Sequence, residues 1–157
     1  MKTLNKNDWL KVLSTVTIFT LTLLFIYLPF REKKLSKRAD QISRFEVLFE
    51  EGKNLYNIGF YRDALTKLDS SISLQEFYAP SHYYLGKTYQ EIRIIDSALI
   101  SFQNVLSLDP ESYQARIAIA EILIETGNLR MAEKYLYEAS IINPYGEEVY
   151  ILIKAIK

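Results

Sequence analysis

Cysteine is absent from the 157 residues, and the chain has a single histidine. The lack of cysteine excludes disulfides, thiolate metal sites and cysteine nucleophiles. Glycine and proline are scarce, at five and four residues, and the sequence contains no glycine-rich phosphate loop, no nucleophile-elbow serine and no spaced histidine cluster. We therefore expect a protein that is not an enzyme and that uses no cofactor, no metal and no small-molecule substrate.

What the chain does contain favours helices. Hydrophobic residues make up 49% and charged residues 24% of the sequence, which is the ordinary range of a folded domain. Leu, Ile, Ala, Glu and Lys are plentiful, and these residues suit helices joined by short turns better than strands. The composition predicts an all-α fold.

The formal net charge of zero conceals two regions of opposite sign. Residues 1–38 hold eight Lys and Arg against two acidic residues, whereas the remainder holds eleven against seventeen. Binding to nucleic acid needs a basic face on the folded part, and here the folded part is acidic. We expect no nucleic-acid partner.

An apolar segment of nineteen residues without a charge runs from Val12 to Phe30. As a helix it would be roughly 28 Å long, which matches the hydrocarbon thickness of a bilayer. Trp9 stands near one end and Tyr27 near the other, where rings prefer the headgroup layer. We predict a basic tail over residues 1–11, a transmembrane helix in contact with lipid over 12–30, and a charged, helical stalk over 31–44.

Two other interpretations of this segment stay open. Lys2, Lys6 and Lys11 resemble the basic start of a cleaved secretory signal, but the apolar stretch is long for a signal and no small-residue cleavage site follows it. A buried core helix is disfavoured because the segment is apolar on all sides. The predicted location is a bacterial inner membrane. The flanking basic residues narrowly favour a cytoplasmic folded part, although a signal anchor with a short basic tail would export it.

From residue 45 the chain repeats with a period of 34 residues, over 45–78, 79–112 and 113–146. A small residue at the eighth position of each repeat and an alanine at the twentieth would let two helices approach closely, and a large residue at the twenty-fourth would fill the space between them. Gly59 and Gly127 supply the left-handed residue that ends the first helix of a pair. The aligned sets are Gly52, Gly86 and Ala120; Ala64, Ala98 and Ala132; and Leu68, Phe102 and Leu136.

These residues resemble the tetratricopeptide repeat (TPR) family, which has this period and these small and large positions. The second repeat, Tyr84-Leu85-Gly86-x-x-Tyr89 followed by Ala98, Phe102 and Pro110, is the closest match. The resemblance implies an α-solenoid of three helix pairs, at 45–58 and 61–74, 79–92 and 95–108, and 113–126 and 129–142. The sequence departs from the family pattern at Glu51, Glu76, His82, Arg93 and Arg116.

After the third repeat, residues 147–157 are predicted to form a helix that caps the array. Val149, Tyr150, Ile153 and Ile156 form its expected apolar stripe. His82, the lone histidine, is expected to be a packing or groove-lining residue, because catalysis or zinc binding would need partners that the sequence lacks.

In this family the first helix of each pair lines a concave surface, so the resemblance implies a groove that binds a protein or peptide. The groove is expected to be aromatic and basic toward the first two repeats and acidic toward the third. For Phe49 and Ile117, packing against neighbouring helices is the alternative. The candidate groove residues are Phe49, Lys53, Tyr56, Asn57, Tyr83, Lys87, Gln90, Ile117, Glu121 and Ile124.

Some family members are chaperone co-factors that hold a C-terminal carboxylate with basic residues and Asn. The matching positions here are Phe49, Lys53, Gln114 and Ala118, which lack that pattern. The predicted function is therefore that of a membrane-tethered adaptor for some other partner. The alternative is an assembly subunit of a membrane or envelope complex that acts through its transmembrane helix, although that helix has no G-x-x-x-G pattern.

Overall fold

The structure is a computed structural model that describes the backbone of residues 5–156 and the side chains of residue 5 and residues 14–156. The start of the predicted tail, residues 1–4, and Lys157 of the predicted cap lie outside the described residues, as do the side chains of Trp9, Lys11 and Val12. All secondary structure between residues 5 and 156 is helical. The helices are α1 (Lys6–Asn57), α2 (Tyr61–Leu74), α3 (Ala79–Glu91), α4 (Ile95–Leu108), α5 (Tyr113–Glu125), α6 (Leu129–Ile142) and α7 (Glu147–Ala155).

The chain divides into two units between Ser43 and Arg44. In the first unit every described side chain from Ser14 to Ser43 is exposed, including Phe25 at 81%. The hydroxyls of Thr17, Thr20 and Thr22 donate to backbone carbonyls three residues earlier, at 2.8–2.9 Å. Because each hydroxyl is satisfied inside the helix, it adds little unpaired polar surface.

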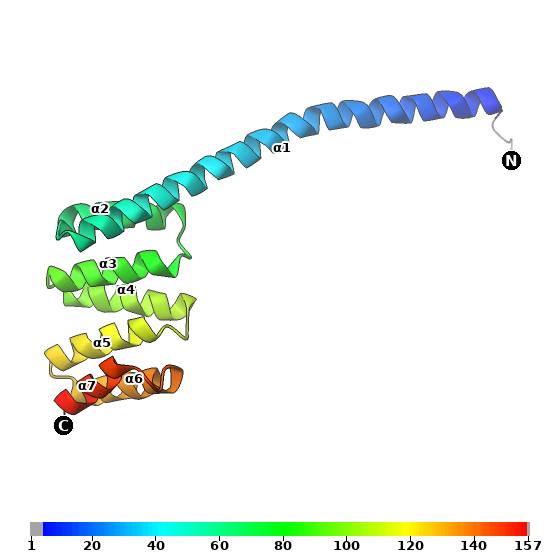
Figure 1. Ribbon diagram of the computed structural model, residues 1–157. Helices are drawn as coiled ribbons and strands as arrows, with labels where there is room; N and C mark the ends of the chain where they lie inside the picture. The colour runs from blue at the N-terminus through cyan, green and yellow to red at the C-terminus, as the bar shows by residue number, and fades with distance from the viewer. Residues whose placement is uncertain (1–4, 157) are drawn as a thin grey trace. The chain divides into compact units, whose positions relative to one another are not determined.

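The second unit consists of stacked antiparallel helix pairs, in chain order from the last turns of α1 to α7 (Figure 1). The second helices of the pairs, α2, α4 and α6, have the predicted bounds. The first helices end one residue earlier than predicted, at Asn57, Glu91 and Glu125. The seven-helix array is an all-α solenoid of the expected type.

Close approach within each pair depends on the small residues that the repeat predicts. A Cβ atom on Gly52 would lie 2.8 Å from Leu68, and one on Gly86 would lie 2.8 Å from the ring of Phe102. Ala64, Ala98 and Ala132 are fully buried, as are Leu68, Phe102 and Leu136. A larger side chain at any of these positions would separate the two helices of its pair.

The turns within the pairs have left-handed backbone at the same repeat position. Gly59 has φ +86° and Gly127 has φ +77°, as predicted. Arg93 stands at this position in the second repeat with φ 64°, which is strained for a residue with a Cβ. Its guanidinium Nη1 lies 2.8 Å from Glu125 Oε2 and so links the second and third repeats.

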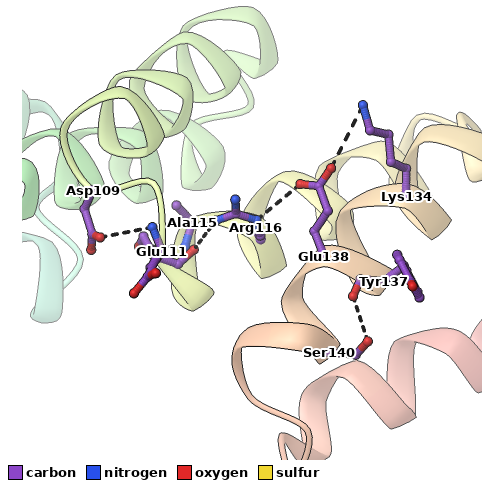
Figure 2. Close-up of polar contacts among 9 residues, drawn as sticks. Asp109, Glu111, Ala115, Arg116, Lys134, Tyr137, Glu138 and Ser140 are labelled. Carbon is purple, nitrogen blue, oxygen red and sulfur yellow. Dashed lines mark hydrogen bonds and ion pairs between the residues drawn. The ribbon is translucent and has the colours of Figure 1, made fainter.

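Two residues that depart from the family pattern, Glu51 and Arg116, form ion pairs with the second helix of their own repeat. Glu51 of α1 lies 2.6 Å from Lys67 of α2. Arg116 of α5 contacts Glu138 of α6 at 3.2 Å, and Lys134 approaches the other oxygen of that carboxylate (Figure 2). At these positions the charged side chains join the helices where the family more often uses an apolar contact.

Helix α7 packs on α5 and α6, and its residues continue the 34-residue register of the first helices of the pairs. The buried residues at this end of the array, which we call the third hydrophobic cluster, are Ile117, Ala120, Leu136, Ala139 and Val149. Leu152, Ile153 and Ile156 of α7 pack against this cluster together with Val149. These positions correspond, 34 residues later, to Ala115, Ala118, Ile119 and Ile122 of α5. The predicted stripe is wrong at Tyr150, which is 71% exposed; Leu152 packs against the cluster instead.

Candidate peptide-binding groove

The junction between the first and second repeats is filled with aromatic rings. Phe49 is only 7% exposed, because the ring of Tyr78 meets it edge-on at 5.1 Å and Tyr84 at 5.9 Å. Tyr78 also contacts Phe45 at 5.0 Å. The structure therefore corrects the assignment of Phe49 to an open groove surface: it is a core residue of this junction.

Lys53 and Tyr56 complete this filled surface. The Lys53 ammonium lies 5.9 Å from the centroid of Phe49 and 6.0 Å from that of Tyr84, and it pairs with Glu50 at 3.4 Å. Tyr56 contacts Tyr84 at 5.7 Å. Burial, followed by the nearby Glu91 carboxylate, raises the pKa of Tyr56 to about 12. The predicted aromatic and basic side chains are thus adjacent, but they mainly contact one another.

The junction between the second and third repeats is hollowed instead. One hollow of about 320 Å³, which we call the apolar hollow, lies where the starts of α3 and α5 meet the end of α4. Its rim is held by local hydrogen bonds: the Glu111 N–H donates to Asp109 (Figure 2), and the Ala115 N–H donates to Ser112, the N-cap of α5. It is lined by Ala79, Pro80, Tyr83, Val105, Asp109, Ser112 and Gln114.

A second hollow of about 190 Å³, which we call the charged hollow, lies beside the first and shares Tyr83 and Gln114 with it. The structure brings four predicted groove residues together here, Tyr83, Lys87, Ile117 and Glu121. Ile117 is nevertheless 7% exposed and packs mainly into the third hydrophobic cluster, so its assignment to the groove surface is corrected to the floor. The other lining residues are Tyr113, Gln114, Ala118 and Glu148.

The electrostatics of the charged hollow are set by one ammonium and two carboxylates. Lys87 donates a hydrogen bond to Gln90 at 3.3 Å, and the Tyr113 hydroxyl donates to Glu148 at 2.9 Å. The backbone N–H of Glu148, and then the Tyr113 hydroxyl, lower the pKa of the Glu148 carboxyl. Burial, followed by the charge of Glu121, raises the pKa of Tyr83. The Glu148 carboxylate therefore stays charged at neutral pH.

The remaining predicted residues contribute less to these hollows. Gln90 accepts the hydrogen bond from Lys87 beside the charged hollow. Ile124 packs against two hydrophobic clusters, so it is a packing residue rather than a groove contact. Asn57 is exposed at the end of α1. His82 is buried and its Nε2–H donates to the Glu76 carbonyl at 2.8 Å, which identifies it as a packing residue.

Sequence reasoning missed several residues of the groove. Two tyrosines that fill the first junction, Tyr78 and Tyr84, were not among the candidates. Two residues that line the charged hollow, Ala118 and Glu148, were not among them either. The 34-residue period carried a signal for Glu148, because extending it by one repeat places Glu148 at the position of Gln114. It carried none for the burial of the rings, which depends on the partners that each ring meets.

Neither a protein-family profile nor a curated protein sequence matches the chain. Among solved structures, the Yersinia enterocolitica type III secretion translocator chaperone SycD is similar, with 23% identity over 73% of this chain and 92% of that chain and a TM-score of 0.70. The Arabidopsis OM64 TPR domain has 15% identity over 74% and 97%, with a TM-score of 0.71. The first TPR of Spaghetti (RPAP3), bound to the HSP90 peptide SRMEEVD, has 15% identity over 73% and 90%, with a TM-score of 0.69.

These likenesses show a TPR fold. Two of the similar proteins were solved with peptides: SycD with a peptide of the translocator YopD, and RPAP3 with its HSP90 peptide.

Proposed function

We propose that the protein is a membrane-tethered adaptor that binds a segment of another protein in the groove between its second and third repeats. The observation that carries the proposal is the pair of adjacent hollows between α3 and α5, which share Tyr83 and Gln114. A depression with an apolar part and a few polar groups is the usual form of a binding site. The proposal includes no catalytic step.

The tether is supported by the first unit. Among the described residues, one helix is long and apolar enough to cross a membrane by length and composition, and none of its apolar window is buried. A core helix would bury such a window, whereas Ile18, Phe25 and Ile26 are all exposed. Leaving this much apolar surface in water is unfavourable. We propose the bacterial inner membrane as its location, with the repeats on the cytoplasmic side.

Site-specific photocrosslinking tests the groove in cells. A photoreactive amino acid at Gln114, which lines both hollows, should give a defined crosslink to one partner protein. The same residue at Gln103, exposed on α4, is the matched control and should give none. Equal crosslinks from both positions, or from neither, would place the binding surface elsewhere.

Membrane fractionation tests the tether. The protein should stay in the pellet after washes with high salt and alkaline carbonate, because a buried apolar helix is insensitive to screening. Replacing residues 12–30 by an unrelated apolar span should leave the Gln114 crosslink intact. Loss of that crosslink would favour the assembly subunit whose transmembrane helix recognises a partner.

A further inference from the structure

Each hollow lies where the first junction has a tyrosine. Ser112, on the rim of the apolar hollow, is the repeat equivalent of Tyr78, whose ring packs on Phe45 and Phe49. Ala118, in the charged hollow, is the equivalent of Tyr84. The same backbone framework is therefore closed at one junction and open at the next because two rings are replaced by a hydroxyl and a methyl group.

The open junction is acidic. Glu121 and Glu148 line the charged hollow against the single ammonium of Lys87, and Asp109 stands on the rim of the apolar hollow. Among the described residues Glu121 has no cation within ion-pair distance, whereas Lys87 has a hydrogen bond to Gln90. From Arg44 onward the chain holds eleven basic and sixteen acidic residues, so its long-range field also favours a basic partner.

The length that the two hollows cover together can be derived from α3. Pro80 lines the apolar hollow and Lys87 the charged hollow. Seven residues separate them, a rise of about 10 Å along the helix axis. An extended segment lying along α3 would cover that distance with about three residues.

We infer that the groove selects an extended protein segment with an apolar side chain for the apolar hollow and, about three residues away, a lysine or arginine that pairs with Glu121 and Glu148. The inference rests on the proposed function and specifies its partner. It places the partner at the acidic part of the expected groove and away from the first junction, because the rings and the lysine of that junction already contact one another.

A peptide selection tests this chemistry. A phage-displayed library of random peptides would be selected on the full chain in detergent micelles, and the enriched peptides would be synthesised with a fluorophore. The enriched sequences should pair an apolar residue with Lys or Arg about three residues apart. Glu121→Gln with Glu148→Gln should weaken their binding about tenfold at low salt, which corresponds to about 1.4 kcal/mol, and should reduce the salt dependence.

Matched variants show whether a loss of peptide binding comes from the lost charge, from misfolding or from a site elsewhere on the surface. Glu46→Gln with Glu133→Gln, at two exposed positions outside the hollows, makes the same change in net charge and should leave affinity within about twofold, the scale of an exposed charge. Ala118→Tyr should block binding by closing the charged hollow as Tyr84 closes its equivalent. Gln114→Trp, at an exposed position, should also block binding and protects the test if Ala118→Tyr fails to fold.

The possible outcomes separate a failure of the inferred partner chemistry from a failure of the proposed function. Peptides that are blocked by Gln114→Trp but carry acidic residues, or that ignore the loss of Glu121 and Glu148, would overturn the inferred partner while the groove remains the site. Peptides that bind equally well to the parent and to Gln114→Trp would overturn the proposed function itself.

Discussion

The two junctions between repeats have the same repeat register, but aromatic rings fill the surface of the first junction and the surface of the second is hollowed. At the first junction Phe49, Tyr78 and Tyr84 pack edge to face, and each ring removes the others from solvent. At the second junction serine and alanine stand at the tyrosine positions, and adjacent hollows remain. The comparison teaches that aromatic side chains on a concave surface do not by themselves make a binding site, since rings can satisfy one another.

The largest effect is expected from emptying the filled junction. Phe49→Ala should lower the free energy of unfolding by about 3–5 kcal/mol, because a buried ring is removed from between three others. Urea unfolding followed by circular dichroism measures it. The control is Gln114→Ala at the open junction, which should change stability by less than about 0.5 kcal/mol. A stable Phe49→Ala protein would show that the first junction is also open.

The helix pairs on either side of the junctions should be sensitive to added volume. Ala98 is fully buried in the hydrophobic cluster that contains Phe102 and Ala118. Ala98→Leu should destabilise the fold by about 1–3 kcal/mol, because the bulky side chain forces the helices apart. Thermal unfolding compared with Ala98→Ser, which keeps the volume small, measures the effect. Tolerance of leucine would contradict the 34-residue register on which both junctions are aligned.

The two equivalent lysines should differ on a smaller scale. Lys53→Met removes an ammonium that faces two rings and Glu50, and should cost about 0.5–1 kcal/mol of stability. Lys87→Met removes an ammonium whose hydrogen bond among the described residues is to Gln90, and it should change stability by less than about 0.5 kcal/mol. Chemical denaturation of both variants at two salt concentrations provides the measurement. Equal losses would mean that Lys87 is as enclosed as Lys53.

The smallest effect concerns ionisation of Tyr56. Its folded-state pKa of about 12 exceeds the ordinary value of 10.0, because burial and Glu91 disfavour the phenolate. The folded state therefore holds its proton more tightly than the unfolded state, so this contribution is complete below pH 10 and is lost as pH rises from about 10 to 12. Ultraviolet titration should show one late-ionising tyrosine fewer in Tyr56→Phe. An unchanged titration would mean that the ring is open to solvent.

The fold was predictable to a large extent because it depends on local periodicity. The second helices have the bounds that the repeat predicts, and Gly52 and Gly86 lie against Leu68 and Phe102 as their positions require. The candidate site was predictable only in part. Tyr83, Lys87 and Glu121 lie together at the hollows, whereas Phe49, Ile117 and Ile124 pack inward, and Tyr150 of the predicted cap is exposed.

The helix pairs, their turns and their order follow from local sequence, because a period of 34 residues with small and large side chains at fixed positions sets how each helix stacks on the next. The apolar helix ahead of the repeats follows from its composition. Which part of the concave surface is open depends on contacts between residues that are distant in sequence. That choice depends on whether the ring at a given position meets another ring from the next repeat, as Tyr84 meets Phe49, or whether its place is taken by a side chain as small as that of Ala118.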